Sequence, residues 1–196
     1  MTMQGETRFS EGYLAGLKQI LDAFDHEGFE AMIRALLKAR EQGALIFVMG
    51  NGGSASTASH WVCDMNKGCS PGESGRFRMI CLNDSISTML AYANDLCYAD
   101  VFVEPLKNFF NPGDVVIGIS GSGNSENVLR AVAWAREHGG VTVGLTGFSG
   151  GKLAGMVDVP IVARVNDMQK VEDVHMIVVH MAMQRVRQAL GCDSAC

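Results

Sequence analysis

Five short apolar runs divide the chain, and each is followed by a segment whose apolar residues recur every three or four positions. The runs cover residues 44–49, 78–82, 115–119, 141–145 and 158–163. Apolar runs that alternate with helical patterns are typical of parallel strands joined by helices. We therefore expect an α/β fold: a three-layer αβα sandwich around a five-stranded parallel sheet, wound as in flavodoxin-like proteins. Pro160 cannot donate to a strand ladder, so the last strand is expected at an edge of the sheet.

Two amphipathic segments precede the first apolar run. Residues 8–25 place Phe9, Tyr13 and Leu17 on one stripe, and residues 29–37 form a second stripe. We expect an N-terminal helical arm over residues 8–42, folded as a hairpin that packs either on another subunit or on one face of the sheet. Further helices are expected at residues 54–67, 86–93, 99–109, 124–138 and 170–190. The chain contains no linker or internal repeat, so residues 1–196 form a single domain with its α/β core at 44–190.

Three of the predicted strands end in turns rich in glycine and serine. The turns are Gly50-Asn-Gly-Gly-Ser-Ala-Ser56, Ser120-Gly-Ser-Gly-Asn-Ser125 and Thr146-Gly-Phe-Ser-Gly-Gly151. Because the carboxyl ends of parallel strands meet at one edge of a sheet, we expect the three turns to converge on one crevice. Free N–H groups at a helix start, serine hydroxyls and closely approaching glycines together favour a phosphate ligand. For one such turn alone, a serine-capped connection without a ligand is the alternative.

The second turn is the best candidate phosphate site. Ser120, Ser122 and Ser125 supply hydroxyls, and Gly121 lets the backbone approach the ligand. The turn lacks the Lys-Ser/Thr pair of a Walker loop and the third glycine of a dinucleotide fingerprint. With no lysine or arginine in the turn, a single phosphate monoester is a better fit than a triphosphate.

Several titratable side chains are expected near this crevice, and two arrangements of them are chemically plausible. His60 and Asp64 are four residues apart on one helix, a spacing that suits either a hydrogen bond or two ligands of one metal ion. A carboxylate facing a neutral imidazole suits proton transfer between adjacent carbons, as in aldose–ketose isomerisation. Alternatively, two histidines and two carboxylates bind one Zn²⁺, the set being His60, Asp64, Glu172 and His180. Eight residues of straight helix rise about 12 Å, so a metal shared by Glu172 and His180 needs either Glu172 at a frayed helix start or an ion near the limit of reach of both side chains.

The remaining titratable residues and the composition narrow the function further. His175 is expected to face the core or an interface, whereas Asp95 and Asp173 lie near the crevice. A net charge of −5 without any basic run argues against nucleic-acid binding. No apolar stretch reaches the roughly 18 residues of a membrane span, and the polar N-terminus does not resemble a signal peptide. Six cysteines without CxxC spacing predict free thiols in the reducing cytoplasm, with Cys192 and Cys196 in a polar tail.

Four motifs together resemble the sugar isomerase (SIS) domain family. They are Gly50-Asn-Gly-Gly-Ser-Ala-Ser56, Ile119-Ser-Gly-Ser-Gly-Asn-Ser125, Leu145-Thr-Gly-Phe-Ser-Gly-Gly-Lys-Leu153 and the segment from Glu172-Asp-Val-His to His180. Their order and spacing, over about residues 8–190, are most similar to the phosphoheptose isomerase branch. The serine turn marks only the superfamily, whereas the pair of His60 and His180 points to the isomerases.

This resemblance implies an enzyme that converts sedoheptulose 7-phosphate to D-glycero-heptose 7-phosphate through an enediol(ate), for nucleotide-activated heptose and surface polysaccharide. It implies a homotetramer with sites at the subunit interfaces and one Zn²⁺ in each site. Asp64 would be the base and His180 its proton partner. The metal ligands would be His60, Asp64, Glu172 and His180. The substrate-binding residues would be Asn51, Gly52, Gly53, Ser54, Asp95, Ser120, Gly121, Ser122, Ser125 and Glu172.

The sequence departs from the family pattern at positions that matter for this chemistry. Asp64 stands where the family usually has glutamate, and Glu172 stands where it usually has glutamine. Gln169 often corresponds to aspartate, and an arginine expected near Lys67 is absent. These changes leave open whether Asp64 or Glu172 is the base and which phosphosugar is the substrate. A further alternative is a non-catalytic phosphosugar-binding SIS protein, of the kind that assists replication initiation and lacks the histidine at position 180.

Overall fold

The chain folds around a parallel sheet whose strands follow the order β2-β1-β3-β4-β5. The computed structural model describes residues 4–70 and 75–191, with side chains from residue 8 onward, so the predicted tail with Cys192 and Cys196 lies outside the described residues. The five strands are β1 (Ile46–Gly50), β2 (Met79–Cys81), β3 (Val115–Ser120), β4 (Val141–Gly147) and β5 (Val159–Ala163). This order is the flavodoxin-like winding, and it confirms the predicted five-stranded sheet with β5 at an edge.

Helices cover both faces of the sheet, as the apolar strands require. They are α1 (Gln4–Asp22), α2 (His26–Gln42), α3 (Gly53–Gly68), α4 (Ile86–Asp95), α5 (Val103–Lys107), α6 (Glu126–Glu137), α7 (Gly151–Met156) and α8 (Met168–Ala189), with the 3₁₀ turn η1 (Tyr98–Asp100). Helix α7 is too short to give a periodic pattern and was not predicted. None of the helices in the described part of the chain is both long and apolar enough to cross a membrane.

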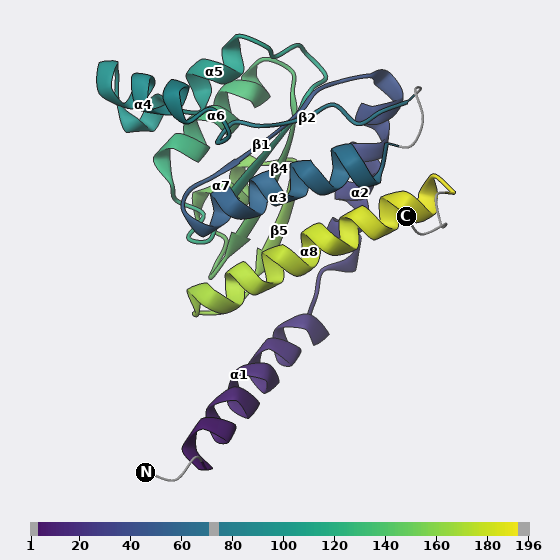
Figure 1. Ribbon diagram of the computed structural model, residues 1–196, viewed down its shortest axis with the longest axis vertical. Helices are drawn as coiled ribbons and strands as arrows, with labels where there is room; N and C mark the ends of the chain where they lie inside the picture. The colour runs from purple at the N-terminus through teal and green to yellow at the C-terminus, as the bar shows by residue number, and fades with distance from the viewer. Residues whose placement is uncertain (1–3, 71–74, 192–196) are drawn as a thin grey trace.

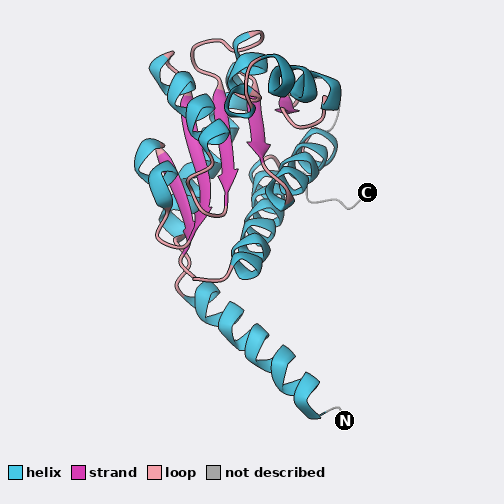
Figure 2. Cartoon of the chain, turned by 90° about the vertical axis from the view of Figure 1, so that its left-hand side faces the viewer, coloured by secondary structure: helices cyan, strands magenta, loops and turns pink. Residues whose placement is uncertain are grey.

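The side chains of β1 alternate between two hydrophobic clusters, one on each face of the sheet. Ile46 and Val48 belong to the cluster beneath α2, α3 and α8, whereas Phe47 and Met49 belong to the cluster beneath α5, α6 and α7. Successive residues of a strand point to opposite faces, so a strand buried on both sides must be apolar throughout. The two clusters complete the three layers seen in Figures 1 and 2.

Helix α1 does not form the predicted hairpin with α2. The helix extends away from the α/β core, while α2 lies against it (Figures 1 and 2). Its C-terminal half packs on the core through Leu17, Ile20 and Leu21, but Phe9 and Leu14 are exposed. The hairpin prediction is therefore wrong: α1 leads away from α2, and Phe9 and Leu14 of its apolar stripe are left exposed.

Candidate active site

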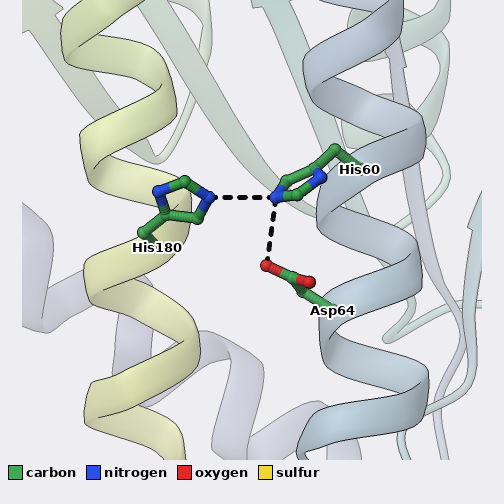
Figure 3. A group of neighbouring side chains, drawn as sticks. All are labelled: His60, Asp64 and His180. Carbon is green, nitrogen blue, oxygen red and sulfur yellow. Dashed lines mark hydrogen bonds and ion pairs between the residues drawn. The ribbon is translucent and has the colours of Figure 1, made fainter.

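Two helices that are distant in sequence, α3 and α8, lie side by side and bring three polar side chains together. His60 and Asp64 project from α3, and His180 projects from α8 toward them (Figure 3). The Nε2 atoms of His60 and His180 are 2.9 Å apart, and Asp64 Oδ2 lies 3.2 Å from His60 Nε2. The predicted grouping of His60, Asp64 and His180 is thus present in a single chain. With its side chain 43% exposed, His60 opens this cluster to solvent.

The turn between β1 and α3 determines where α3 starts. A β-carbon on Gly50 would lie 2.8 Å from backbone atoms of Ser54, so only glycine allows the first turn of α3 to fold back against the strand end. Asn83, at the end of β2, holds Gly50 from the other side, because its amide donates to the Gly50 carbonyl at 2.8 Å and accepts from the Gly50 N–H at 3.2 Å. These contacts aim α3 along the sheet, with His60 two turns further on.

Glu172 does not join the histidine cluster. Helix α8 begins at Met168, where Asp167 accepts a hydrogen bond from the Lys170 N–H, so Glu172 lies within regular helix rather than at a frayed end. Its carboxylate lies against the first residue of α3, since a β-carbon on Gly53 would be 2.7 and 2.8 Å from the two oxygens. Two turns of α8 therefore separate Glu172 from His180, and among the described residues the group of possible metal ligands consists of His60, Asp64 and His180.

The serine turn lies at the end of β3, where two hydroxyls face each other. Ser120 Oγ and Ser125 Oγ are 3.0 Å apart, and Ser125 is the N-cap of α6 without a capping hydrogen bond from its side chain. The hydroxyl of Ser122 accepts from the Asn124 N–H at 3.2 Å. Gly123 has a φ of +66°, and any β-carbon there would overlap the carbonyl of Gly150. The turn can therefore offer hydroxyls and helix N–H groups to an anion.

Direct hydrogen bonds join the turns that follow β1, β3 and β4. The Gly147 N–H donates to the Gly121 carbonyl at 2.8 Å, which links the ends of β3 and β4. Asn51, after β1, exchanges two hydrogen bonds of 2.9 Å with Asn127 in the first turn of α6. The predicted convergence of the three turns at one edge of the sheet is therefore confirmed.

Sequence reasoning missed Asn127 and Tyr98, both of which contact Asn51. The Tyr98 hydroxyl donates to Asn51 Oδ1 at 2.8 Å, and Asn127 is buried. A carboxamide two residues after Ser125, at the start of a helix, was a usable signal for Asn127. Tyr98 offered none, because it lies between two predicted helices, outside any motif.

Two other predicted crevice residues have different surroundings. Asp95 ends α4 and is exposed, three residues before Tyr98, and it accepts a hydrogen bond from Asn94. Asp173 accepts a 2.5 Å hydrogen bond from the Tyr13 hydroxyl, so it faces α1 rather than the cluster. This bond raises the pKa of Tyr13 to about 12.

His175 is a core residue, as expected. Its Nε2 lies 3.0 Å from the carbonyl oxygen of Thr146 at the end of β4, and burial lowers the pKa of the imidazole. A neutral ring then donates from Nε2 to Thr146 and helps to fix α8 against the strand.

The three clustered donors suit a divalent metal ion. Ligand atoms of a tetrahedral zinc site with bonds near 2.0–2.1 Å lie about 3.3 Å apart, and two imidazoles with one carboxylate are a common protein ligand set. The donor atoms of His60, Asp64 and His180 all lie within 4.8 Å of one another. The 2.9 and 3.2 Å separations involving His60 are close to the tetrahedral value, so binding needs only small side-chain movements.

Comparison with known proteins identifies the family. A model of the SIS domain matches residues 12–147. The phosphoheptose isomerase of Geotalea daltonii is 36% identical over 167 residues, which cover 82% of this chain and 83% of that protein. The phosphoheptose isomerase of Helicobacter pylori is 32% identical over 172 residues, which cover 84% of this chain and 85% of that protein. The solved phosphoheptose isomerase of Neisseria gonorrhoeae superposes with a TM-score of 0.87 at 27% identity, over 95% of this chain and 100% of that one. The chain therefore belongs to the SIS domain family and, within it, to the phosphoheptose isomerases.

Proposed function

We propose that the protein is an aldose–ketose isomerase that converts sedoheptulose 7-phosphate to D-glycero-heptose 7-phosphate, a precursor of nucleotide-activated heptose for surface polysaccharide. The observation that carries this proposal is the contact of His60 with both Asp64 and His180, in a member of the phosphoheptose isomerases. Binding of a phosphosugar alone does not require a carboxylate and two imidazoles in contact, whereas proton transfer uses such groups. The substrate phosphate would be bound by the serine turn.

The serine turn would bind the phosphate by hydrogen bonds and the positive end of the α6 dipole. Hydroxyls of Ser120, Ser122 and Ser125 would donate to its oxygens, with Gly121 allowing close approach. The adjacent hydroxyls of Ser120 and Ser125 support this role, because one anion can accept from both. We assign the sugar to the start of α3 and the residues around it, namely Asn51, Gly52, Gly53, Ser54, Asp95 and Glu172.

Isomerisation needs one proton moved between carbons and one moved between oxygens. We propose that Asp64 takes the proton from C1 of the ketose and returns it to C2, while His180 transfers a proton between O1 and O2. The intermediate is an enediol(ate), and the two transfers convert the C2 carbonyl to a hydroxyl and the C1 hydroxyl to an aldehyde. His60 engages Asp64 through Oδ2, so we assign the carbon proton to Oδ1.

We propose that one Zn²⁺ per chain binds to His60, Asp64 and Nε2 of His180, which leaves Nδ1 of His180 for the proton transfer. When bound, the metal would polarise the substrate oxygens and favour loss of the neighbouring carbon proton. Glu172 belonged to the set expected from the family, but its position beside Gly53 is better suited to a sugar hydroxyl. We therefore assign Glu172 to the substrate.

We further propose a cytoplasmic homotetramer with its sites at subunit interfaces. Helix α4 has no buried residue in the single chain, and Ile86 and Leu90 on it are 69% and 65% exposed. An exposed apolar face of this kind is typical of a surface covered by another protein. The described cysteines, at positions 63, 69, 81 and 97, are free thiols, as is usual in a reducing compartment.

Incubation with sedoheptulose 7-phosphate in D₂O, followed by NMR of the products, tests the proposed reaction. We expect a heptose 7-phosphate that carries deuterium at C2, because the proton on the base exchanges with solvent. Binding without turnover would instead indicate a phosphosugar-binding protein. Turnover of a different phosphosugar, and not of sedoheptulose 7-phosphate, would support the isomerase chemistry but contradict the proposed substrate. His180→Gln, which removes the proton partner and conserves size, is the matched inactive control.

A further inference from the structure

Asn127 is a buried polar residue to which neither the family resemblance nor the proposed mechanism assigns a role. It lies in the first turn of α6, two residues after Ser125, with only 2% of its surface exposed. Its Oδ1 accepts from Asn51 Nδ2 at 2.9 Å and from the Val128 N–H at 3.0 Å, and its Nδ2 donates to Asn51 Oδ1 at 2.9 Å. Two carboxamides thus face each other in a closed pair.

The pair has only one orientation that satisfies all of its partners. The Val128 N–H requires an acceptor, so the oxygen of Asn127 must face it, and the amide of Asn127 then faces the oxygen of Asn51. The Tyr98 hydroxyl donates to the same oxygen of Asn51 at 2.8 Å. Asn51 therefore receives two hydrogen bonds and donates one, which leaves a single side-chain N–H for any ligand.

This network, which we call the Asn127 clamp (Asn127, Asn51 and Tyr98), joins three segments that are distant in sequence. Asn51 begins the turn that leads to Gly53 and α3, Asn127 follows the serine turn, and Tyr98 lies in η1 just after Asp95. These segments carry the proposed sugar contacts and the proposed phosphate contacts. Beyond the pairing of β1 with β3, the clamp is therefore a direct side-chain connection between the two halves of the site.

We propose that Asn127 is a positioning residue of the isomerase: acting through Asn51, it holds the sugar-binding turn at a set distance from the phosphate-binding turn. The inference rests on the proposed function of the site. A phosphosugar anchored by its phosphate presents C1 and C2 to Asp64 correctly only if that distance is maintained. Misplacement by about 1 Å of the reacting groups can cost about 100-fold in rate.

A double-mutant cycle tests this role. Asn127→Ala should lower kcat/KM for sedoheptulose 7-phosphate by about 10- to 100-fold, whereas the inhibition constant of inorganic phosphate, which occupies only the serine turn, should change by less than about twofold. In protein that already carries Asn51→Ala, adding Asn127→Ala should lower kcat/KM by less than about a further threefold, because the effects of two substitutions that remove the same contact are not additive. Tyr98→Phe, which creates no cavity, should show the same non-additivity with a smaller loss.

Asn66→Ala is the matched control for a merely structural effect. Asn66 also exchanges two hydrogen bonds with a neighbour, at 2.8 and 3.1 Å with the backbone of Met79, but it does so at the start of β2, away from the three turns. It should lower the melting temperature without the large loss of kcat/KM. Additive losses, an equal effect on phosphate inhibition, or an equal loss in Asn66→Ala would each overturn the positioning role.

The test also separates this proposal from the proposed reaction. If the wild-type protein does not turn over sedoheptulose 7-phosphate, the proposed reaction fails. Calorimetry still gives the ratio of the protein's affinity for sedoheptulose 7-phosphate to its affinity for inorganic phosphate. A positioning role then predicts that Asn127→Ala lowers this ratio at least fivefold, and an unchanged ratio would overturn it.

Discussion

Asp64 contacts His60 through one carboxylate oxygen, which leaves the second oxygen as the base that we assign to the carbon proton. Its side chain is one methylene shorter than the glutamate usual in the family. The 2.9 Å separation of His180 Nε2 and His60 Nε2 shows that α3 and α8 lie close together, so we expect the shorter side chain of Asp64 to reach the substrate between them. At the residue scale, we therefore expect proton transfer to depend on Asp64 rather than on Glu172.

We predict that Asp64→Asn lowers kcat by about 10²- to 10⁴-fold, the usual contribution of a general base. Calorimetry should still show substrate binding, because the amide conserves shape and the phosphate contacts are untouched. Asp173→Asn should be mild, since that carboxylate binds Tyr13. Retention of most of the rate by Asp64→Asn, together with its loss in Glu172→Gln, would transfer the role of base to Glu172.

The metal assignment predicts a difference between two other variants. Protein purified without chelator should contain about one zinc per chain by elemental analysis, and His60→Ala should lose it because His60 contacts both other ligands. Glu172→Gln should keep the metal, because Glu172 lies two turns of α8 away from His180. Zinc loss in Glu172→Gln would restore Glu172 to the ligand set, and full activity without metal would remove the metal from the mechanism.

At the scale of single elements, the serine turn and the start of α6 act as one unit. The double substitution Ser122→Ala and Ser125→Ala should weaken phosphosugar binding, since each lost hydrogen bond to a charged group costs about 1.5–3 kcal/mol. The fold should persist, because Ser125 makes no capping bond through its side chain. Unchanged affinity by calorimetry would remove this turn from the site.

Helix α1 is fastened to α8 by a contact whose strength should depend on pH. Hydrogen bonding to Asp173 raises the pKa of Tyr13 from 10.0 to about 12, so the folded state favours the protonated phenol. This stabilisation is fully present below about pH 10 and is lost as the pH rises toward about 12. The difference in melting temperature between the wild-type protein and Tyr13→Phe should therefore be constant up to about pH 10 and then shrink. A constant difference throughout would show that the hydroxyl does not bind Asp173.

At the scale of the whole molecule, the exposed apolar face of α4 is the surface through which we propose that subunits associate. The double substitution Ile86→Glu and Leu90→Glu should dissociate the proposed tetramer, because burial of a charge without a partner is unfavourable. Light scattering should then give a lower mass, and activity should fall if neighbouring subunits complete the site. Ala91→Glu, which places a charge about 100° round the helix from Leu90, is the control. Dissociation by both changes, or by neither, would contradict α4 as the interface.

Local patterns in the sequence determined the architecture. The five strands, their parallel winding and the edge position of β5 follow from short apolar runs, helical periods and the missing N–H of Pro160, all of which depend on near neighbours. The convergence of the glycine- and serine-rich turns followed from topology alone. The prediction that α1 and α2 form a hairpin was wrong, because an apolar stripe identifies a helix that packs against some surface without specifying which surface that is.

Only the tertiary structure decided which functional residues meet. His60 and His180 are 120 positions apart, and their 2.9 Å contact depends on how α3 and α8 pack over the sheet. The same packing separates Glu172 from them, whereas the pairing of β1 with β3 brings Asn127, at the start of α6, opposite Asn51. Helix periodicity fixes the face on which a side chain lies, whereas the rotation and crossing of two helices are set by the summed packing of the core between them. For that reason the residue types needed for the chemistry could be predicted from the sequence, whereas the residues that actually lie together in the site were determined by the fold.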